Sequence, residues 1–276
     1  MASKFYIMNE KNERYGLNKA SEGIFTDPKG FGVSYDADFL RVGDRWLTDR
    51  RELKQPAPSG KIYFPVEPYP TFQNFLRFIN RAKELFLIYQ PAGVGTEYFA
   101  DIDVIKIEKT GYSLRESFTV PVSFACKSLF YTAEKFEYHI ERAMRETRWN
   151  FRWNTKFNDS AFVYFDFDNT GDVESPFVLS FTGYCTNPKI TVYVDNAPVH
   201  ELKMNLTLEA DEKLEISTHD NDLHITVDGV ERNDCLDFTA ENFFKMPVGK
   251  SQIYFRSETG RVNNIVVNLE KYFKAV

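Results

Sequence analysis

Short segments with an apolar residue at every second position, each followed by a turn signal, most constrain how this chain can fold. Residues 136–140 (FEYHI) and 177–181 (FVLSF) are of this kind, and Asp228-Gly229 between two apolar runs is a two-residue hairpin signal. Segments of this type fill most of the chain beyond residue 132. Many short strands with regular turns predict a β-sandwich or a jelly roll there.

The first half of the chain adds one helical pattern to its strands. Apolar residues recur at spacings of three and four from Phe72 to Ala82, which predicts an amphipathic helix with Thr71 as its N-cap. Residues 35–53 predict a β-hairpin that turns near Gly43.

A boundary near residue 131 separates these two patterns. We therefore predict a mainly β protein, with a small β domain that contains one helix at residues 1–131 and a β-sandwich at residues 132–276. Pro121 interrupts a strand of the first domain, so we expect it at a sheet edge or at a bulge.

Charge and hydropathy exclude several classes of partner. The net charge is −6 and no basic tract stands out, which argues against binding to nucleic acid or to an anionic membrane. An acidic surface could still line a channel through which DNA slides, because phosphates are repelled. No segment approaches the ~20 apolar residues of a membrane span, and the N-terminus lacks the apolar stretch of a signal peptide. We expect no membrane partner.

The cysteines are Cys126, Cys185 and Cys235, an odd number with wide spacing. This pattern fits neither a disulfide framework nor a zinc site, so we predict buried, reduced thiols in a chain made in a cytoplasm.

The segment from Asp166 to Thr170 matches the D-x-D-x-T nucleophile motif of haloacid-dehalogenase-type phosphatases. That chemistry needs a parallel sheet with crossover helices, whereas the residues that follow predict antiparallel strands. Carboxylates at positions 166, 168 and 172 also partly match a calcium loop, but Phe177 stands where an EF-hand needs glutamate. We therefore predict no catalytic residues, no cofactor and no metal site.

The strand around Trp149 and Trp153 carries aromatic residues on one face and polar residues on the other. A sugar-stacking platform built on these two tryptophans is one interpretation. A buried core face is favoured, because the opposite face is plainly polar.

The order of short signatures along the chain resembles the distal tail protein family of siphophages. In the first domain the similar segments are Phe31-Gly32-Val33, Ser59 to Phe64, the Phe72–Asn80 helix and Tyr98 to Ile102. The second half is similar at Asn169-Thr170-Gly171, Asn187-Pro188 and residues 243–249 (FFKMPVG).

This resemblance implies a ring-forming N-terminal domain with a β-hairpin belt and a galectin-like C-terminal sandwich. It implies a hexameric hub at the phage tail tip, which joins the tail tube protein to a tail-tip protein and lets DNA pass through its channel. Receptor-binding proteins or a host cell-wall glycan are further partners that it suggests. The protein would be located in the virion after synthesis in the host cytoplasm.

Exposed strand edges in the first domain point to the contact between copies. Unpaired edges are expected at residues 30–35, in the hairpin and in the strand of Pro121. A neighbouring copy can dock against such edges. Tyr35, Phe39 and Trp46 are the candidate interface anchors.

The alternatives to a hub are a carbohydrate-binding module or adhesin, and an enzyme that uses Asp166. A hairpin and helix in the first domain favour the hub over a free-standing sugar module.

Overall fold

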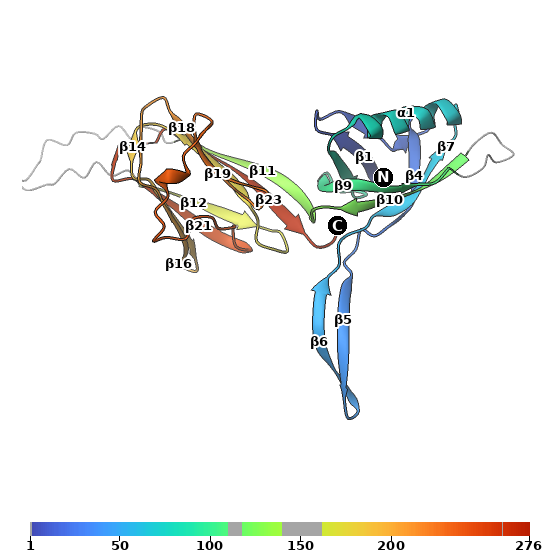
Figure 1. The fold of residues 1–276 in the computed structure, drawn as a ribbon, viewed down its shortest axis with the longest axis horizontal. Helices are drawn as coiled ribbons and strands as arrows, with labels where there is room; N and C mark the ends of the chain where they lie inside the picture. The colour runs from blue at the N-terminus through green and yellow to red at the C-terminus, as the bar shows by residue number, and fades with distance from the viewer. Residues whose placement is uncertain (1, 110–117, 140–161, 261) are drawn as a thin grey trace, which may run out of the picture. The chain divides into compact units, whose positions relative to one another are not determined.

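The computed structural model describes residues 2–109, 118–139, 162–260 and 262–276. The chain divides into two compact units, an N-terminal unit of residues 1–132 with 272–276 and a sandwich unit of residues 133–271. The C-terminal segment 272–276 thus belongs with the first unit, which the sequence did not predict. The mainly β character predicted from the sequence is confirmed (Figure 1).

The N-terminal unit is built on an antiparallel sheet in the order β2-β1-β8-β9-β10-β7-β4-β3. It is a sheet and not a closed barrel. Strand β9 joins its two halves, pairing with β8 through residues 98–102 and with β10 through residues 102–107. The strands are β1 (Lys4–Asn9), β2 (Arg14–Gly16), β3 (Asn18–Lys19), β4 (Gly23–Lys29), β7 (Ser59–Phe64), β8 (Leu85–Gln90), β9 (Tyr98–Ile107) and β10 (Phe118–Cys126).

Helix α1 (Pro68–Arg81) covers this sheet with its apolar stripe, as the periodicity predicts (Figure 1). Phe72 and Phe75 are buried, with ring centroids 5.8 and 6.1 Å from the ring of Phe64 on β7. The prediction of Thr71 as the N-cap is wrong. The helix begins earlier, at Pro68, and the Thr71 hydroxyl donates to the Val66 carbonyl oxygen at 3.0 Å.

Pro121 does not lie on an edge strand, because β10 pairs with β7 on one side and with β9 on the other. It does not lie at a bulge either, because the register shift between β10 and β9 falls at Ser123/Phe124. The last β9 pair is Val122 with Ile107, and the Pro121 carbonyl accepts from Glu108 N just beyond it, at 3.0 Å. The Pro121 nitrogen points to the same side of β10 as the Pro121 carbonyl. The position of its missing N–H therefore faces a place where β9 has already ended.

Residues 30–34 form no strand, which corrects the strand edge predicted there.

The sandwich unit stacks two antiparallel sheets. One has the order β20-β19-β18-β13-β23-β11 and the other β12-β21-β15-β16, with a small sheet β17-β14-β22 beside them. Strands β11 and β23 each carry the chain across the boundary between the two units. The strands are β11 (Phe130–His139), β12 (Phe162–Asn169), β13 (Phe177–Thr182), β14 (Cys185–Thr186), β15 (Lys189–Val194), β16 (Ala197–Lys203), β17 (Thr207–Leu208), β18 (Lys213–His219), β19 (Asp222–Val227), β20 (Val230–Glu231), β21 (Gly249–Arg256), β22 (Thr259–Gly260) and β23 (Asn264–Phe273), with a 3-10 helix at Asn233–Cys235.

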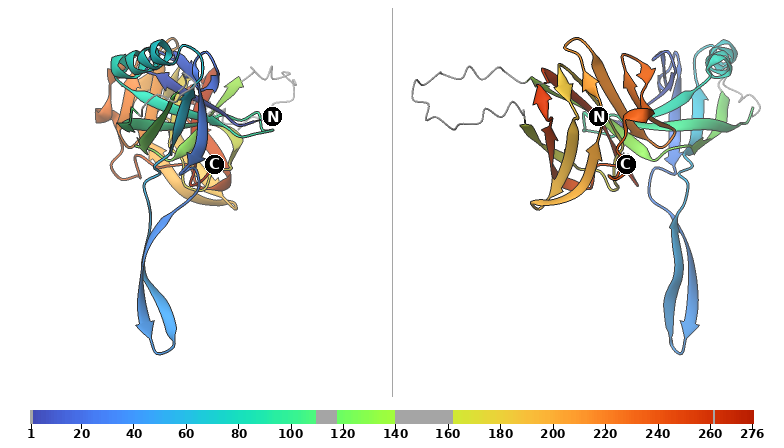
Figure 2. Two further views of the ribbon diagram at one scale, coloured as in Figure 1. Left: turned by 90° about the vertical axis from the view of Figure 1, so that its right-hand side faces the viewer. Right: turned by 60° about the vertical axis from the view of Figure 1, so that its left-hand side comes forward.

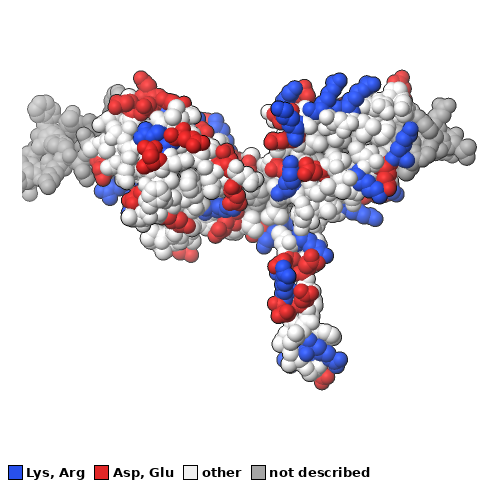
Figure 3. Space-filling view, in the orientation of Figure 1, with Lys and Arg blue, Asp and Glu red and all other residues white. Residues whose placement is uncertain are grey.

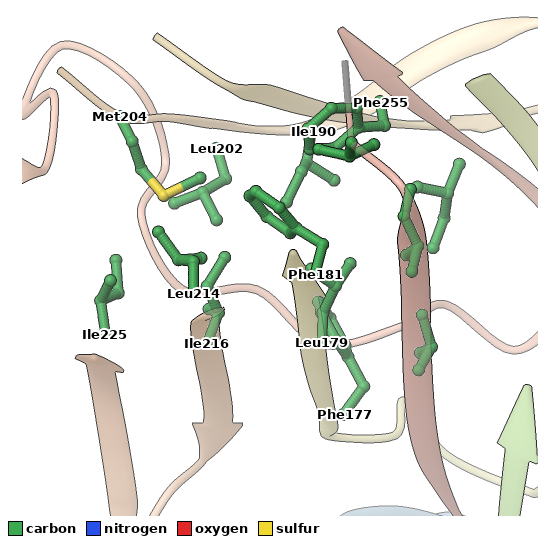
Figure 4. Close-up of a cluster of buried hydrophobic side chains, with 14 of the residues drawn as sticks. Phe177, Leu179, Phe181, Ile190, Leu202, Met204, Leu214, Ile216, Ile225 and Phe255 are labelled. Atoms are coloured by element: carbon green, nitrogen blue, oxygen red, sulfur yellow. The ribbon is translucent and has the colours of Figure 1, made fainter. Parts of the chain in front are cut away.

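Side chains from both sheets meet in one buried core, which confirms the sandwich architecture (Figure 4). Phe181 of β13 and Phe255 of β21 face each other across the layers with ring centroids 4.8 Å apart. The predicted Asp228-Gly229 hairpin is confirmed too, because Val227 pairs with Val230 and both turn residues have positive φ. This left-handed geometry is what a two-residue hairpin turn requires.

All of the cysteines are buried and form no disulfide, as predicted. Burial raises the pKa of the Cys185 thiol to about 12, and burial together with the nearby Asp101 carboxylate raises that of Cys126 to about 12. Burial also raises the pKa of Cys235. Thiolate is the reactive form, so these groups act as small apolar core residues.

Among the described residues, none of the helices combines the length and apolar character needed to cross a membrane.

Candidate assembly hairpin

A two-stranded hairpin projects from the N-terminal unit (Figure 2). It consists of β5 (Tyr35–Val42) and β6 (Arg45–Leu53), which pair only with each other among the described strands. The Gly43-Asp44 turn connects them as predicted, with Gly43 at φ 65°. Every residue of both strands is exposed.

Apolar side chains cover both faces of the outer half of this hairpin. Paired residues share a face, so the Phe39–Thr48 and Arg41–Trp46 pairs place two aromatic rings on one side. The opposite side carries the Leu40–Leu47 pair and Val42. The exposed fractions are 57% for Phe39, 65% for Trp46 and 58% for Leu40. A strand with one solvated face would have polar residues on one of these sides.

Charged residues dominate the inner half of the hairpin, nearer the sheet (Figure 3). Arg50 and Glu52 form an ion pair at 2.6 Å, and Lys54 reaches Asp36 at 2.5 Å. The Arg51 guanidinium lies 3.9 Å from the centre of the Tyr35 ring. Exposed pairs of this kind contribute less than about 1 kcal/mol each. They orient the side chains without giving the hairpin a core of its own.

The base of the hairpin is firmly attached to the N-terminal sheet. The Phe31 ring packs against Phe5, Tyr89 and Phe130 with centroids 4.9 to 5.7 Å away. On the returning chain the Gln55 side-chain amide donates to the Cys126 carbonyl at 2.7 Å.

Two features of the backbone also hold the base in place. The Pro56 and Pro58 carbonyls accept from β10 backbone amides at 3.0 and 2.9 Å. Gly30 has φ 81°, and a Cβ there would lie 2.4 Å from the Ala57 carbonyl oxygen. The two chains at the base therefore pass each other too closely for any side chain at position 30.

This geometry suits insertion into another surface. An isolated two-stranded hairpin is marginally stable in water, and large apolar side chains on both of its faces are desolvated only when protein lies on both sides. Tyr35, Phe39 and Trp46 all lie on one face, with Tyr35 near the base and the other two near the tip.

Sequence reasoning missed the opposite face of the tip, which carries Leu40, Val42 and Leu47. The signal was present in the sequence. Phe39-Leu40 and Trp46-Leu47 are adjacent apolar pairs on either side of a Gly-Asp turn, and neighbours along a strand point to opposite faces.

Asp166 and Asp168 lie on the outer face of the sandwich unit. Both are exposed on β12, which pairs antiparallel with β21, and the Asp166 carboxylate accepts from the Gln252 amide at 2.8 Å. Asn169 follows with a buried side chain that accepts from Gly171 N and donates to the Met246 carbonyl. The motif thus ends a strand and fixes a turn, and no parallel strand edge frames the carboxylates among the described pairings.

Within the described ranges, no three His, Cys, Asp or Glu side chains lie close enough together to hold a metal ion. The candidate sugar platform of Trp149 and Trp153 lies outside the described residues.

Comparison with known proteins identifies the family to which the N-terminal unit belongs. Residues 4–127 match the family model described as "Distal tail protein, N-terminal domain". The chain carries the N-terminal domain of the distal tail protein family. This finding confirms the family resemblance inferred from the sequence. The matched range includes the hairpin and the sheet that anchors it.

Solved structures with this fold extend the likeness over the whole chain. A chain of the phage P2 baseplate, in its activated conformation with calcium, is 14% identical with TM-score 0.66 and full coverage of both chains. The SPP1 Dit protein, described as a paradigm of the hub adsorption apparatus in phages infecting Gram-positive bacteria, is 11% identical with TM-score 0.61, covering 96% of this chain and 98% of that one. At these identities the likeness establishes the fold. No curated protein matches the chain.

Proposed function

We propose that this protein is a structural hub of a phage tail tip, in which the N-terminal units of six copies close into a ring. The observation that carries the proposal is the hairpin β5–β6, which has apolar residues on both faces and no partner strand of its own among the described residues. The distal tail protein domain over residues 4–127 supports it. A head-to-tail contact repeated by rotation closes into a ring, and a hairpin that reaches an adjacent copy is such a contact.

The remaining parts of the proposal concern what the ring joins. One side of the hub would receive the tail tube protein and the other a tail-tip protein, and receptor-binding proteins or a host glycan would be reached through the sandwich units. DNA would pass through the ring, where a chain of net charge −6 repels phosphates. The role is mechanical, so it needs neither a cofactor nor a catalytic group. The protein would be made in the host cytoplasm and located at the virion tail tip.

Removing the hairpin tests its role directly. Replacing residues 37–51 by Asn-Gly joins the paired residues Asp36 and Glu52 through a two-residue turn. We expect this variant to fold, because the removed residues are all exposed, and to be a monomer, because it lacks the proposed contact between copies. The mass from light scattering and the thermal unfolding midpoint are the measurements. A shortened variant that still forms the same oligomer as the wild type would show that the hairpin does not hold the ring together.

A further inference from the structure

The outer face of the sheet β12-β21-β15-β16 carries a row of tyrosines. Tyr164 of β12 is paired with Tyr254 of β21, and their ring centroids are 5.7 Å apart in a stacked arrangement. Tyr193 of β15 continues the row, with its ring centroid 5.0 Å from that of Tyr254. The inward neighbours of these residues, such as Phe165 and Phe255, form the core. The row therefore crosses three strands on the side away from the core.

This row is open to solvent at one end and half-buried along the rest. Tyr164 is 58% exposed, and Tyr193 and Tyr254 are half-buried against each other. Cross-strand aromatic pairs stabilise a sheet, which explains why two rings meet. It does not explain a third ring or the large exposed surface of Tyr164.

Polar side chains border the row on one side at a depression of about 540 Å³. Tyr193 lines it together with the hydrogen-bonded Asp166–Gln252 pair. Asp195 and Asn196, from the turn between β15 and β16, also belong to the polar rim. Carboxylate and amide groups at a rim of this kind accept from and donate to hydroxyl groups.

Basic side chains flank the row on its other side, where Arg256 lies two positions beyond Tyr254 on β21, and they line a second depression of about 410 Å³. Arg256, Lys189 and Lys203 lie side by side there across β21, β15 and β16. The two lysines both bond to Glu201, at 2.6 and 2.8 Å, whereas Arg256 forms no ion pair with a described residue. This side therefore offers a free guanidinium beside charged groups that are already oriented.

Resting on the host-glycan contact in the proposed function, we propose that this face binds a polysaccharide, with pyranose rings stacked on Tyr164, Tyr254 and Tyr193. A sugar ring has an apolar C–H face that fits an aromatic platform, and its hydroxyls point to the edges, where the carboxylates, amides and guanidinium lie. The row is one ring wide and closely bordered by charged side chains. The centre of a protein–protein interface is depleted of such charges, so a glycan fits this surface better than a protein does.

The proposal is tested with the full-length protein on a printed array of bacterial polysaccharides and their oligosaccharide fragments. We expect the wild type to bind at least one of them. Tyr164→Ala should weaken that binding about tenfold or more. Tyr164→Phe should bind as the wild type does, because the aromatic ring remains. Tyr184→Ala is the matched control, since Tyr184 is an exposed tyrosine of the same unit outside the row. Thermal unfolding of each variant separates lost binding from lost structure.

Three results would overturn the proposal. The first is a folded wild type that binds no polysaccharide on the array. The second is a Tyr164→Ala variant that binds as the wild type does. The third is a wild type that binds no glycan but binds another phage protein, with an affinity that the Tyr164→Ala variant loses. That result would make the row a protein interface. The array reports on the sandwich face whether or not the ring forms, so its failure is distinct from failure of the proposed hub.

Discussion

Replacing Phe39 and Trp46 together by serine is expected to abolish assembly of the protein while leaving each copy folded. Aromatic anchors at the centre of an interface cost ~2 kcal/mol or more each when truncated, so the pair should weaken the contact between copies about a thousandfold. Both rings are exposed in the single chain, so their loss should hardly change the unfolding midpoint. Light scattering over a dilution series and a thermal melt are the measurements.

Val94→Ser is the matched control for this double substitution. Val94 is an exposed apolar residue of the same unit, located in the loop between β8 and β9 and outside the hairpin. It should leave the assembly intact. An assembly that survives the Phe39 and Trp46 changes would mean that these side chains do not anchor the contact. A double variant that unfolds would mean that the Phe39 and Trp46 side chains cover the sheet of their own domain instead of contacting another copy.

Phe181→Ala is expected to destabilise the sandwich unit by about 3–5 kcal/mol, the usual cost of removing a buried phenylalanine and leaving a cavity. Phe181 is only 1% exposed, and its ring meets that of Phe255 across the two sheets (Figure 4). Phe238→Ala is the control, because Phe238 is 81% exposed in the same unit and its loss should change stability by less than about 0.5 kcal/mol. Denaturant unfolding measures both, and equal costs would contradict the packing described for the core.

Strands, turns and the helix were largely predictable because each rests on a local rule. Period-two segments became core strands, and the Gly43-Asp44 and Asp228-Gly229 turns formed where the sequence places them. Thr71 was wrongly predicted as the N-cap because a threonine before an apolar run is typical of that position. The helix instead begins at Pro68, and proline fits the first helical position. Pro121 was wrongly predicted at a sheet edge or a bulge. The sequence shows that proline lacks an N–H donor, but it does not show where the neighbouring strand β9 ends.

The candidate surfaces were harder to predict, because exposure is a tertiary property. Phe39 and Trp46 were predicted as candidate anchors, but the second apolar face of the hairpin depends on a pairing register that is known only from the structure. The tyrosine row is less visible still. Tyr164, Tyr193 and Tyr254 lie far apart in the sequence and meet only because β12, β21 and β15 are neighbours in one sheet.

The mass of the wild-type assembly in solution tests the central claim most directly. Native mass spectrometry and light scattering should give six times the 32.2 kDa mass of the chain, as a closed ring with a single stoichiometry at concentrations where the monomer is a minor species. A folded protein that keeps the mass of one chain up to its solubility limit would contradict the proposal that the hairpin closes a ring, and so would a ladder of open oligomers without an end point.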